Sequence, residues 1–167
     1  KGATAELIAM LDQGLAHYAA KVKDYLAVDV KDIPGAGAAG GIGAGLVAFL
    51  NAQLVPGVEL VIEATGMEEL AKEADLVITG EGRTDRQTAF GKAPVGVAKI
   101  AKNYNKPVVC ISGGLSEGWE DILAQGIDAV FSICNAPISL EEAMANATGL
   151  LESASGQVAR IWQAAKE

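Results

Sequence analysis

The sequence has little positive charge and almost no histidine, and each shortage argues against a class of function. Thirteen Lys and Arg stand against 21 Asp and Glu, which gives a net charge of -8. Nucleic acid and anionic membranes bind to basic surfaces, so we expect no partner of either kind. The single histidine, His17, has no serine or carboxylate motif beside it, which argues against a catalytic triad.

Cysteine and long apolar runs are also scarce. The two cysteines, Cys110 and Cys134, each lie in an apolar run typical of a buried strand, which favours free thiols in a reducing cytoplasm over a disulfide. Neither has a C-x-x-C partner, and no His/Cys cluster has the spacing of a zinc site. No signal-peptide pattern opens the chain, and no uncharged apolar stretch reaches the roughly 18 residues of a membrane helix. We therefore expect a cytoplasmic protein without redox or transition-metal chemistry.

The abundant residues are Ala, Gly and aliphatic side chains, arranged in alternating segments. Apolar runs of strand length occur at 58–64, 75–79, 107–112 and 127–133, and helical patterns at 67–73, 94–104, 117–125 and 140–165. This βα repetition indicates a parallel sheet. The strand runs lack polar alternation, so helices should cover both faces. We predict an α/β fold with a doubly wound parallel sheet, a Rossmann-like or flavodoxin-like three-layer arrangement.

The first third of the chain follows a different pattern. Thr4 caps a predicted amphipathic helix over 4–24, and after Pro34 a Gly-rich turn leads into a tightly packed helix. Residues 1–167 should form a single α/β region, in which 1–55 could be a helical, Gly-rich segment of one lobe and 56–167 a parallel-sheet lobe. The chain begins with Lys1 and enters a helical pattern almost at once, so we expect it to be part of a larger two-lobe protein.

The most polar segment directly follows the second strand run and reads Gly80-Glu-Gly-Arg-Thr-Asp-Arg-Gln-Thr-Ala-Phe-Gly-Lys92. Ligands of open α/β sheets bind beyond the carboxyl ends of the strands. Glycines let backbone N–H groups approach a ligand, Arg83 and Lys92 supply positive charge, and the helix near Pro94 presents its positive end. Glu81 and Asp85 could bind Mg²⁺ or accept a proton. The segment therefore predicts a site for a small anion; the alternative is a solvated loop in which Arg83 pairs with a neighbouring carboxylate.

Two further glycine clusters have weaker functional interpretations. Gly35 to Gly40 matches G-x-G-x-x-G, and Glu63 closes the next strand run where a ribose-binding acid would lie, as in a dinucleotide-binding module. Against this, the preceding segment is polar and ends in Pro34, so close helix packing through small residues is the competing interpretation. Ser112-Gly-Gly114 could present N–H groups at the start of a helix, or be an ordinary strand-to-helix turn.

The Gly91-Lys92 pair does not form a P-loop. Ala93 follows Lys92 where a Walker A loop has Ser or Thr, so no P-loop is present.

Several motifs together resemble bacterial glycerate kinases of the glycerate 2-kinase type. They are Pro34-Gly-Ala-Gly-Ala-Ala-Gly-Gly-Ile-Gly-Ala-Gly45, Pro56-Gly-Val-Glu59, Ala74-Asp-Leu-Val-Ile-Thr-Gly-Glu-Gly-Arg-Thr-Asp-Arg-Gln-Thr88 and Gly91-Lys-Ala-Pro94. The resemblance covers essentially the whole chain but only the C-terminal part of the family's longer sequence. It implies phosphorylation of glycerate by ATP with Mg²⁺, giving 2-phosphoglycerate, in an enzyme of two α/β lobes.

The resemblance supports Gly80 to Asp85, Gln87, Thr88, Gly91 and Lys92 as the active-site loop, and we assign roles to the site residues on physical grounds. The expected catalytic residues are Asp85, as base or Mg²⁺ ligand, with Arg83 and Lys92 neutralising the phosphoryl group or the glycerate carboxylate; Glu81 is the second expected Mg²⁺ ligand. The residues expected to bind substrate or phosphate are Gly80, Glu81, Gly82, Thr84, Gln87, Thr88, Gly91, Gly37, Gly40 and Gly41. We expect the chain to be inactive without the rest of the same polypeptide. The alternatives are a dinucleotide-binding module and a non-catalytic domain that senses a phosphorylated metabolite.

Overall fold

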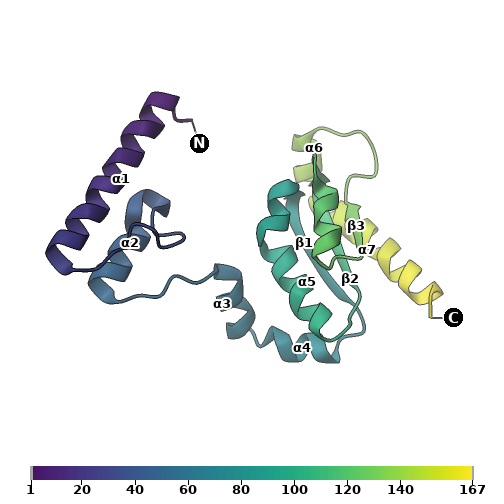
Figure 1. Ribbon diagram of the computed structural model, residues 1–167. Coiled ribbons are helices and arrows are strands. Elements are labelled where there is room, and N and C mark those ends of the chain that lie inside the picture. The colour runs from purple at the N-terminus through teal and green to yellow at the C-terminus, as the bar shows by residue number, and fades with distance from the viewer. Residues whose placement is uncertain (1, 167) are drawn as a thin grey trace. The chain divides into compact units, whose positions relative to one another are not determined.

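The chain divides into two compact units, Lys1–Pro56 and Gly57–Glu167, in a computed structural model that describes residues 2–166. The first unit holds helices α1 (Ala5–Leu26) and α2 (Ala38–Leu50) (Figure 1). The Thr4 side chain accepts a hydrogen bond from the Leu7 amide, so the predicted N-cap and helix are confirmed. Small residues of both helices and their connection form the core, among them Ala19, Ala36 and Ala44.

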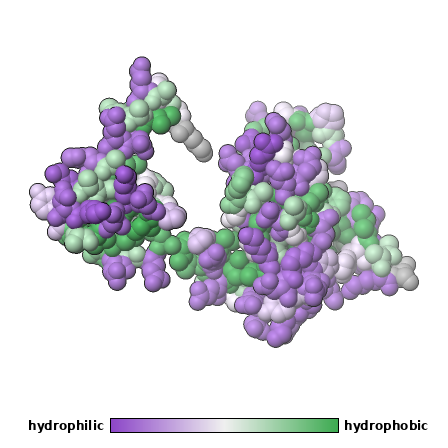
Figure 2. All heavy atoms as spheres, in the orientation of Figure 1, coloured by the Kyte–Doolittle hydropathy of each residue, from purple (hydrophilic) through white to green (hydrophobic). Residues whose placement is uncertain are grey.

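The Gly-rich segment of the first unit is a left-handed turn that leads into a helix. Ala39, Gly40 and Gly41 have φ values of 51°, 71° and 88°, a conformation that costs glycine little. A Cβ on Gly41 would lie 3.1 Å from the Leu15 side chain, so this glycine also lets α2 approach α1 closely. Figure 2 shows hydrophobic atoms at the surface of this unit, where Phe49 and Leu50 are exposed.

The second unit contains a parallel sheet between helices. Its elements, in order, are α3 (Gly57–Ala64), α4 (Met67–Glu73), β1 (Val77–Thr84), the 3-10 helix η1 (Arg86–Phe90), α5 (Ala93–Asn103), β2 (Val108–Leu115), the 3-10 helix η2 (Trp119–Gln125), β3 (Ala129–Ser132), α6 (Leu140–Ala145) and α7 (Ala147–Ala164). The strand order is β1-β2-β3, and both pairs are parallel.

Alternate residues of β2 serve the two faces of the sheet. Val108 and Cys110 are buried in a core with Ala98 of α5, whereas Ile111 packs in a second core with Val158 of α7. Figure 1 shows α5 and α7 on opposite sides of the strands. Helices therefore cover both faces, and the predicted α/β fold with a parallel sheet is confirmed. No helix of the described residues is long and apolar enough to span a bilayer.

The predicted strand at 58–64 is wrong, because this segment is helix α3. Its five apolar residues suggested a strand, but a short apolar run does not distinguish strand from helix by period alone. Val58 and Ile62, one helical turn apart, are the partly buried residues, and Glu59 and Glu63 are exposed. A Cβ on Gly96 would lie 2.5 Å from the Val58 side chain, so α3 packs closely on α5.

Other elements are confirmed with altered bounds. β1 and β2 continue to Thr84 and Leu115, several residues beyond the apolar runs at 75–79 and 107–112. The run at 127–133 yields the shorter strand β3, and the helix predicted at 117–125 is the 3-10 helix η2. The last predicted helix, 140–165, is broken into α6 and α7 at Asn146, which has a φ of -104°.

Candidate functional site

The polar stretch from Gly80 to Lys92 is a strand, a 3-10 helix and a helix N-terminus, not a single loop as predicted. Gly80 to Thr84 belong to β1, η1 follows from Arg86, and Lys92 is the N-cap of α5. The strand continues because glycines on both strands let the two backbones approach closely. A Cβ on Gly80 would lie 2.1 Å from the Ile111 carbonyl oxygen, and one on Gly113 would lie 2.3 Å from the Gly82 carbonyl oxygen. Close approach of the two backbones therefore requires Gly80, whereas a Cβ on Gly82 would meet open space.

Asp85 is held between two cations at the carboxyl end of β1. Its Oδ1 lies 3.4 Å from Lys92 Nζ, and its Oδ2 lies 3.9 Å from an Arg83 guanidinium nitrogen. Oδ1 also accepts a hydrogen bond of 2.9 Å from the Gln87 amide, which caps η1. Burial raises the pKa of Asp85, but the hydrogen bonds from Lys92 and Gln87 and the charges of Lys92 and Arg83 outweigh it, so the pKa lies below its ordinary value. Asp85 is therefore a fixed carboxylate.

Glu81 is anchored by two buried threonines. Thr84 and Thr88 are fully buried, and their hydroxyls donate hydrogen bonds of 3.1 and 2.6 Å to Glu81 Oε1. Thr88 also accepts a hydrogen bond from the Asp85 amide at 3.2 Å. The Thr88 hydroxyl thus links the carboxylate of Glu81 to the backbone of Asp85.

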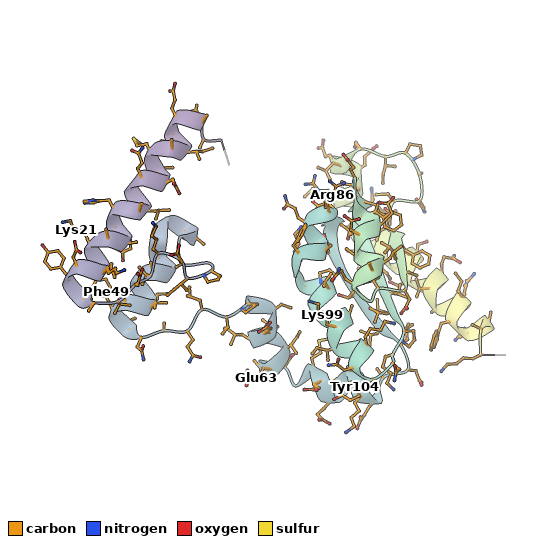
Figure 3. All side chains as sticks on the ribbon, viewed as in Figure 1. Lys21, Phe49, Glu63, Arg86, Lys99 and Tyr104 are labelled. Carbon is orange, nitrogen blue, oxygen red and sulfur yellow. The ribbon has the colours of Figure 1, made fainter. Side chains whose placement is uncertain are left out.

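Gln87 and Gly91 lie at the exposed surface of the same region, Gly91 at the C-terminus of η1 with a φ of 92°. Arg86, labelled in Figure 3, has a separate role: its guanidinium lies 3.5 Å from Asp121 and 3.9 Å from Glu117. The structure thus brings together all the predicted site residues from Gly80 to Lys92. It also shows that Arg86 pairs with acidic residues at the start of η2.

Ser112-Gly-Gly114 is not the helix-initiating turn that the sequence suggested. The three residues lie inside β2, and the next helical element starts only at Trp119. Ser112 is fully buried, and its hydroxyl lies 2.6 Å from that of Thr84. The contribution of Ser112 is its side chain, which sequence reasoning missed.

A cleft of about 950 Å³ adjoins these groups. One wall carries Glu81, Gly82 and Arg83, and the floor is apolar, with Ile78 and Ile111 of the sheet. α6 and α7 supply the opposite wall, which includes Leu140, Ala143, Met144, Thr148 and Leu151. Nothing in the sequence indicated that this last helical segment lines a site, because its apolar residues at helical spacing indicated only packing. The volume lies within the range of small-molecule sites.

Gly37, Gly40 and Gly41 lie in the first unit. The dinucleotide motif there lacks its structural context, because residues 27–34 form no strand before the glycines. Glu63, expected at the end of a strand, lies in α3. The expected ribose-binding arrangement is therefore wrong, and the packing of Gly41 on α1 supports the competing interpretation.

Among residues 2–166, no group of three or more His, Cys, Asp and Glu side chains is arranged to hold a metal ion. Both cysteines are free. Burial raises the pKa of the Cys110 thiol, so this thiol stays protonated. Mg²⁺ needs less than such a cluster, since it is often bound by one or two carboxylates together with substrate phosphates.

Comparison with known proteins gives a consistent result. A model of the glycerate kinase family matches residues 1–163. The chain is 54% identical over 161 residues to a glycerate kinase of Halalkalibacterium halodurans, covering 96% of this chain and 42% of that protein. It is 49% identical over 159 residues to a glycerate 2-kinase of Escherichia coli K12, covering 95% of this chain and 42% of that protein.

A solved structure, described as glycerate kinase 2 from Salmonella typhimurium LT2, matches with a TM-score of 0.75 and 47% identity. The match covers 99% of this chain and 42% of that one, so the chain spans about two fifths of the length of the relatives it matches. The family model covers nearly the whole chain, and the site motifs lie within it. The chain belongs to the glycerate kinase family.

Proposed function

We propose that this chain is the C-terminal part of a cytoplasmic kinase that transfers a phosphoryl group from ATP to the 2-hydroxyl of glycerate, giving 2-phosphoglycerate. Family membership supports glycerate as the substrate, and the name of the Escherichia coli relative, glycerate 2-kinase, supports the 2-hydroxyl. The two free thiols fit the reducing cytoplasm.

The observation that carries the proposal is the pairing of Asp85 with both Lys92 and Arg83, of which Arg83 lines the cleft. Phosphoryl transfer needs positive groups that are already in place where negative charge moves between donor and acceptor. The single negative charge of Asp85 orients both cations but neutralises only one of their two positive charges. Arg83 keeps 71% and Lys92 39% of its side chain exposed, so each can reach an anion.

The two carboxylates take different roles in this proposal. Asp85 uses its oxygens on Lys92, Arg83 and the Gln87 amide, so it orients the cations that bind phosphate or the glycerate carboxylate. Glu81 binds the protein through Oε1 alone, and it forms no ion pair among residues 2–166. Gly82, which is exposed in the cleft wall, can offer its backbone to a ligand.

The donor set at this site suits a magnesium ion bound jointly by protein and nucleotide. Every buried side-chain oxygen of the described residues has a hydrogen-bond partner. Glu81 Oε2 has no such partner within this part of the chain, so this oxygen is not buried and is accessible to a ligand. Glu81 lines the cleft and would hold Mg²⁺, with Asp85 close by in the chain. The ion would offset charge on the transferred group.

The proposal is tested with the full-length enzyme, ATP and glycerate, using phosphorus NMR to identify the product. We expect 2-phosphoglycerate from the wild type and a loss of kcat/KM of roughly 100-fold or more in Lys92→Ala. Lys99→Ala is the matched control, because Lys99 is an exposed lysine of the same helix (Figure 3). Equal activity of the two variants would refute the assigned role of Lys92.

We also propose that residues 1–167 alone do not catalyse phosphorylation of glycerate, since the relatives are more than twice as long. The test is the same assay on this chain by itself. Formation of phosphoglycerate would show that the remainder of the protein is dispensable for chemistry.

A further inference from the structure

A line of buried hydrogen-bonding side chains runs from the middle of β2 to the site. Cys110 Sγ lies 3.4 Å from Ser112 Oγ, and Ser112 Oγ lies 2.6 Å from Thr84 Oγ1. Thr84 in turn donates to Glu81 Oε1 at 3.1 Å. The first three residues have no exposed surface, so each polar group depends on its neighbour in the line.

A second hydroxyl reaches the same carboxylate oxygen from another element. Thr88 of η1 is also fully buried and donates to Glu81 Oε1 at 2.6 Å. Its oxygen accepts a hydrogen bond from the Asp85 amide, which completes its partners. Two side chains from two elements therefore fix one oxygen of Glu81.

The direction of the protons follows from the carboxylate at the end of the line. An ionised carboxylate only accepts, so Thr84 and Thr88 must each give Glu81 their single hydroxyl proton. Thr84 then accepts from Ser112, and Ser112 accepts from the thiol of Cys110, which burial keeps protonated. All hydrogen bonds of the line point toward Glu81, and aligned bonds of this kind reinforce one another.

Neither hydroxyl is available to a ligand. Thr84 and Thr88 have no exposed surface, whereas Glu81 lines the cleft and keeps one oxygen accessible. The network therefore orients a carboxylate without itself reaching the cleft. Orientation by packed, hydrogen-bonded neighbours is what makes a catalytic group effective, because a misplacement of about 1 Å can cost roughly 100-fold in rate.

We propose that Thr84, Thr88 and Ser112 are positioning residues that hold Glu81 in the one orientation used during phosphoryl transfer. This inference rests on the proposed kinase function of the site. It differs from the expectation that Thr84 and Thr88 bind substrate or phosphate directly.

The test uses Thr88→Val, Thr88→Ser and Glu81→Gln in the full-length enzyme, with Thr65→Val as control. Thr65 also donates its hydroxyl within the protein, to Val61 O, but lies in the turn after α3, far along the chain from the network. We expect Thr88→Val to lower kcat by roughly 10- to 100-fold, with the KM for glycerate changed less than about twofold. Thr88→Ser, which keeps the hydroxyl, should restore most of kcat, and Thr65→Val should retain it.

A double-mutant cycle decides whether Thr88 acts through Glu81. Adding Thr88→Val to Glu81→Gln should lower kcat no further, because the group being positioned is already lost. Full kcat in Thr88→Val, or equal and independent losses in both backgrounds, would overturn the inference.

A crystal structure of Thr88→Val gives a readout that does not depend on activity. The inference requires the Glu81 side chain to change rotamer or to occupy more than one conformation, and an unchanged Glu81 would overturn it. A folded wild type that forms no phosphoglycerate would instead overturn the proposed function. The crystal structure of Thr88→Val would still show whether Thr88 holds the Glu81 side chain in place. If Thr88→Val does not fold, Ser112→Ala, which removes a more distant member of the line, takes its place in both measurements.

Discussion

Gly80→Ala should destabilise the second unit strongly, although it adds only one methyl group. The new Cβ would lie 2.1 Å from the Ile111 carbonyl oxygen, and side-chain Cβ atoms essentially never approach closer than 3.0 Å. The two strands must therefore separate by about 1 Å midway along their pairing, where Gly80 lies opposite Ile111. We expect a loss of about 3 kcal/mol, the upper part of the range for overpacking.

Gly114→Ala provides the matched control in the same sheet. A Cβ on Gly114 meets nothing within 4 Å, and no positive φ is needed there. The substitution should be neutral or stabilise slightly, because alanine reduces the entropy of the unfolded chain by up to about 1 kcal/mol. The two glycines should thus differ in the sign of their effect.

Urea unfolding of the full-length protein, followed by tryptophan fluorescence, measures this difference. Trp119 and Trp162 both lie in the second unit and report on it. With a slope near 2 kcal/mol per M, a loss of about 3 kcal/mol lowers the midpoint by about 1.5 M. Equal midpoints for Gly80→Ala and Gly114→Ala would show that the close approach of β1 and β2 does not require glycine.

Three further predictions concern charge, thiol access and helix packing. Because the pKa of Asp85 is depressed in the folded protein, its ion pairs should stabilise the protein fully above about pH 4 and progressively less as the pH falls below it through the folded-state pKa. Asp85→Asn should therefore destabilise the protein more at pH 7 than at pH 3, and a loss equal at both pH values would contradict this. Iodoacetamide should modify half-buried Cys134 before fully buried Cys110 in the native protein, as peptide mass spectrometry would show, and equal rates would refute the burial argument. Gly96→Ala should loosen α3 from α5 and speed hydrogen exchange of the α3 amides, whereas unchanged exchange would mean that the contact is not tight.

The elements with a strong period could be predicted from the sequence. The helix expected at 94–104 is α5, because Pro94 marks its first turn and Val95, Ala98 and Ala101 recur on its buried side. The helical pattern from 140 also begins where predicted, because Ser139 and Glu142 form a capping box at the start of α6. The segment 58–64 could not be assigned from apolar content, although Glu59 and Glu63, spaced one helical turn apart, indicated the helix.

The grouping of charged residues at the candidate site could be predicted from the sequence, but the hydrogen bonds among its side chains could not. A polar stretch after an apolar strand indicated an anion site, and Arg83, Asp85 and Lys92 do lie together. The bond between Ser112 and Thr84 joins residues 28 positions apart, and it depends on the strand register that places Glu81 opposite Ser112. No local pattern encodes that register, so the positioning network was missed.

The glycines show the same limit. Gly80 and Gly82 look alike in the sequence, yet only Gly80 faces a carbonyl oxygen of β2 at close range. Whether a glycine serves packing or a ligand depends on its neighbours in space. The cleft wall from α6 and α7 was missed for a related reason, since their apolar residues indicated only packing.

The most direct test of the account is a crystal structure of the full-length enzyme with glycerate and a non-hydrolysable ATP analogue. The account predicts a phosphate or carboxylate oxygen within about 3 Å of the Arg83 guanidinium or Lys92 Nζ. A structure in which both ligands lie far from these two cations and from Glu81 would contradict it.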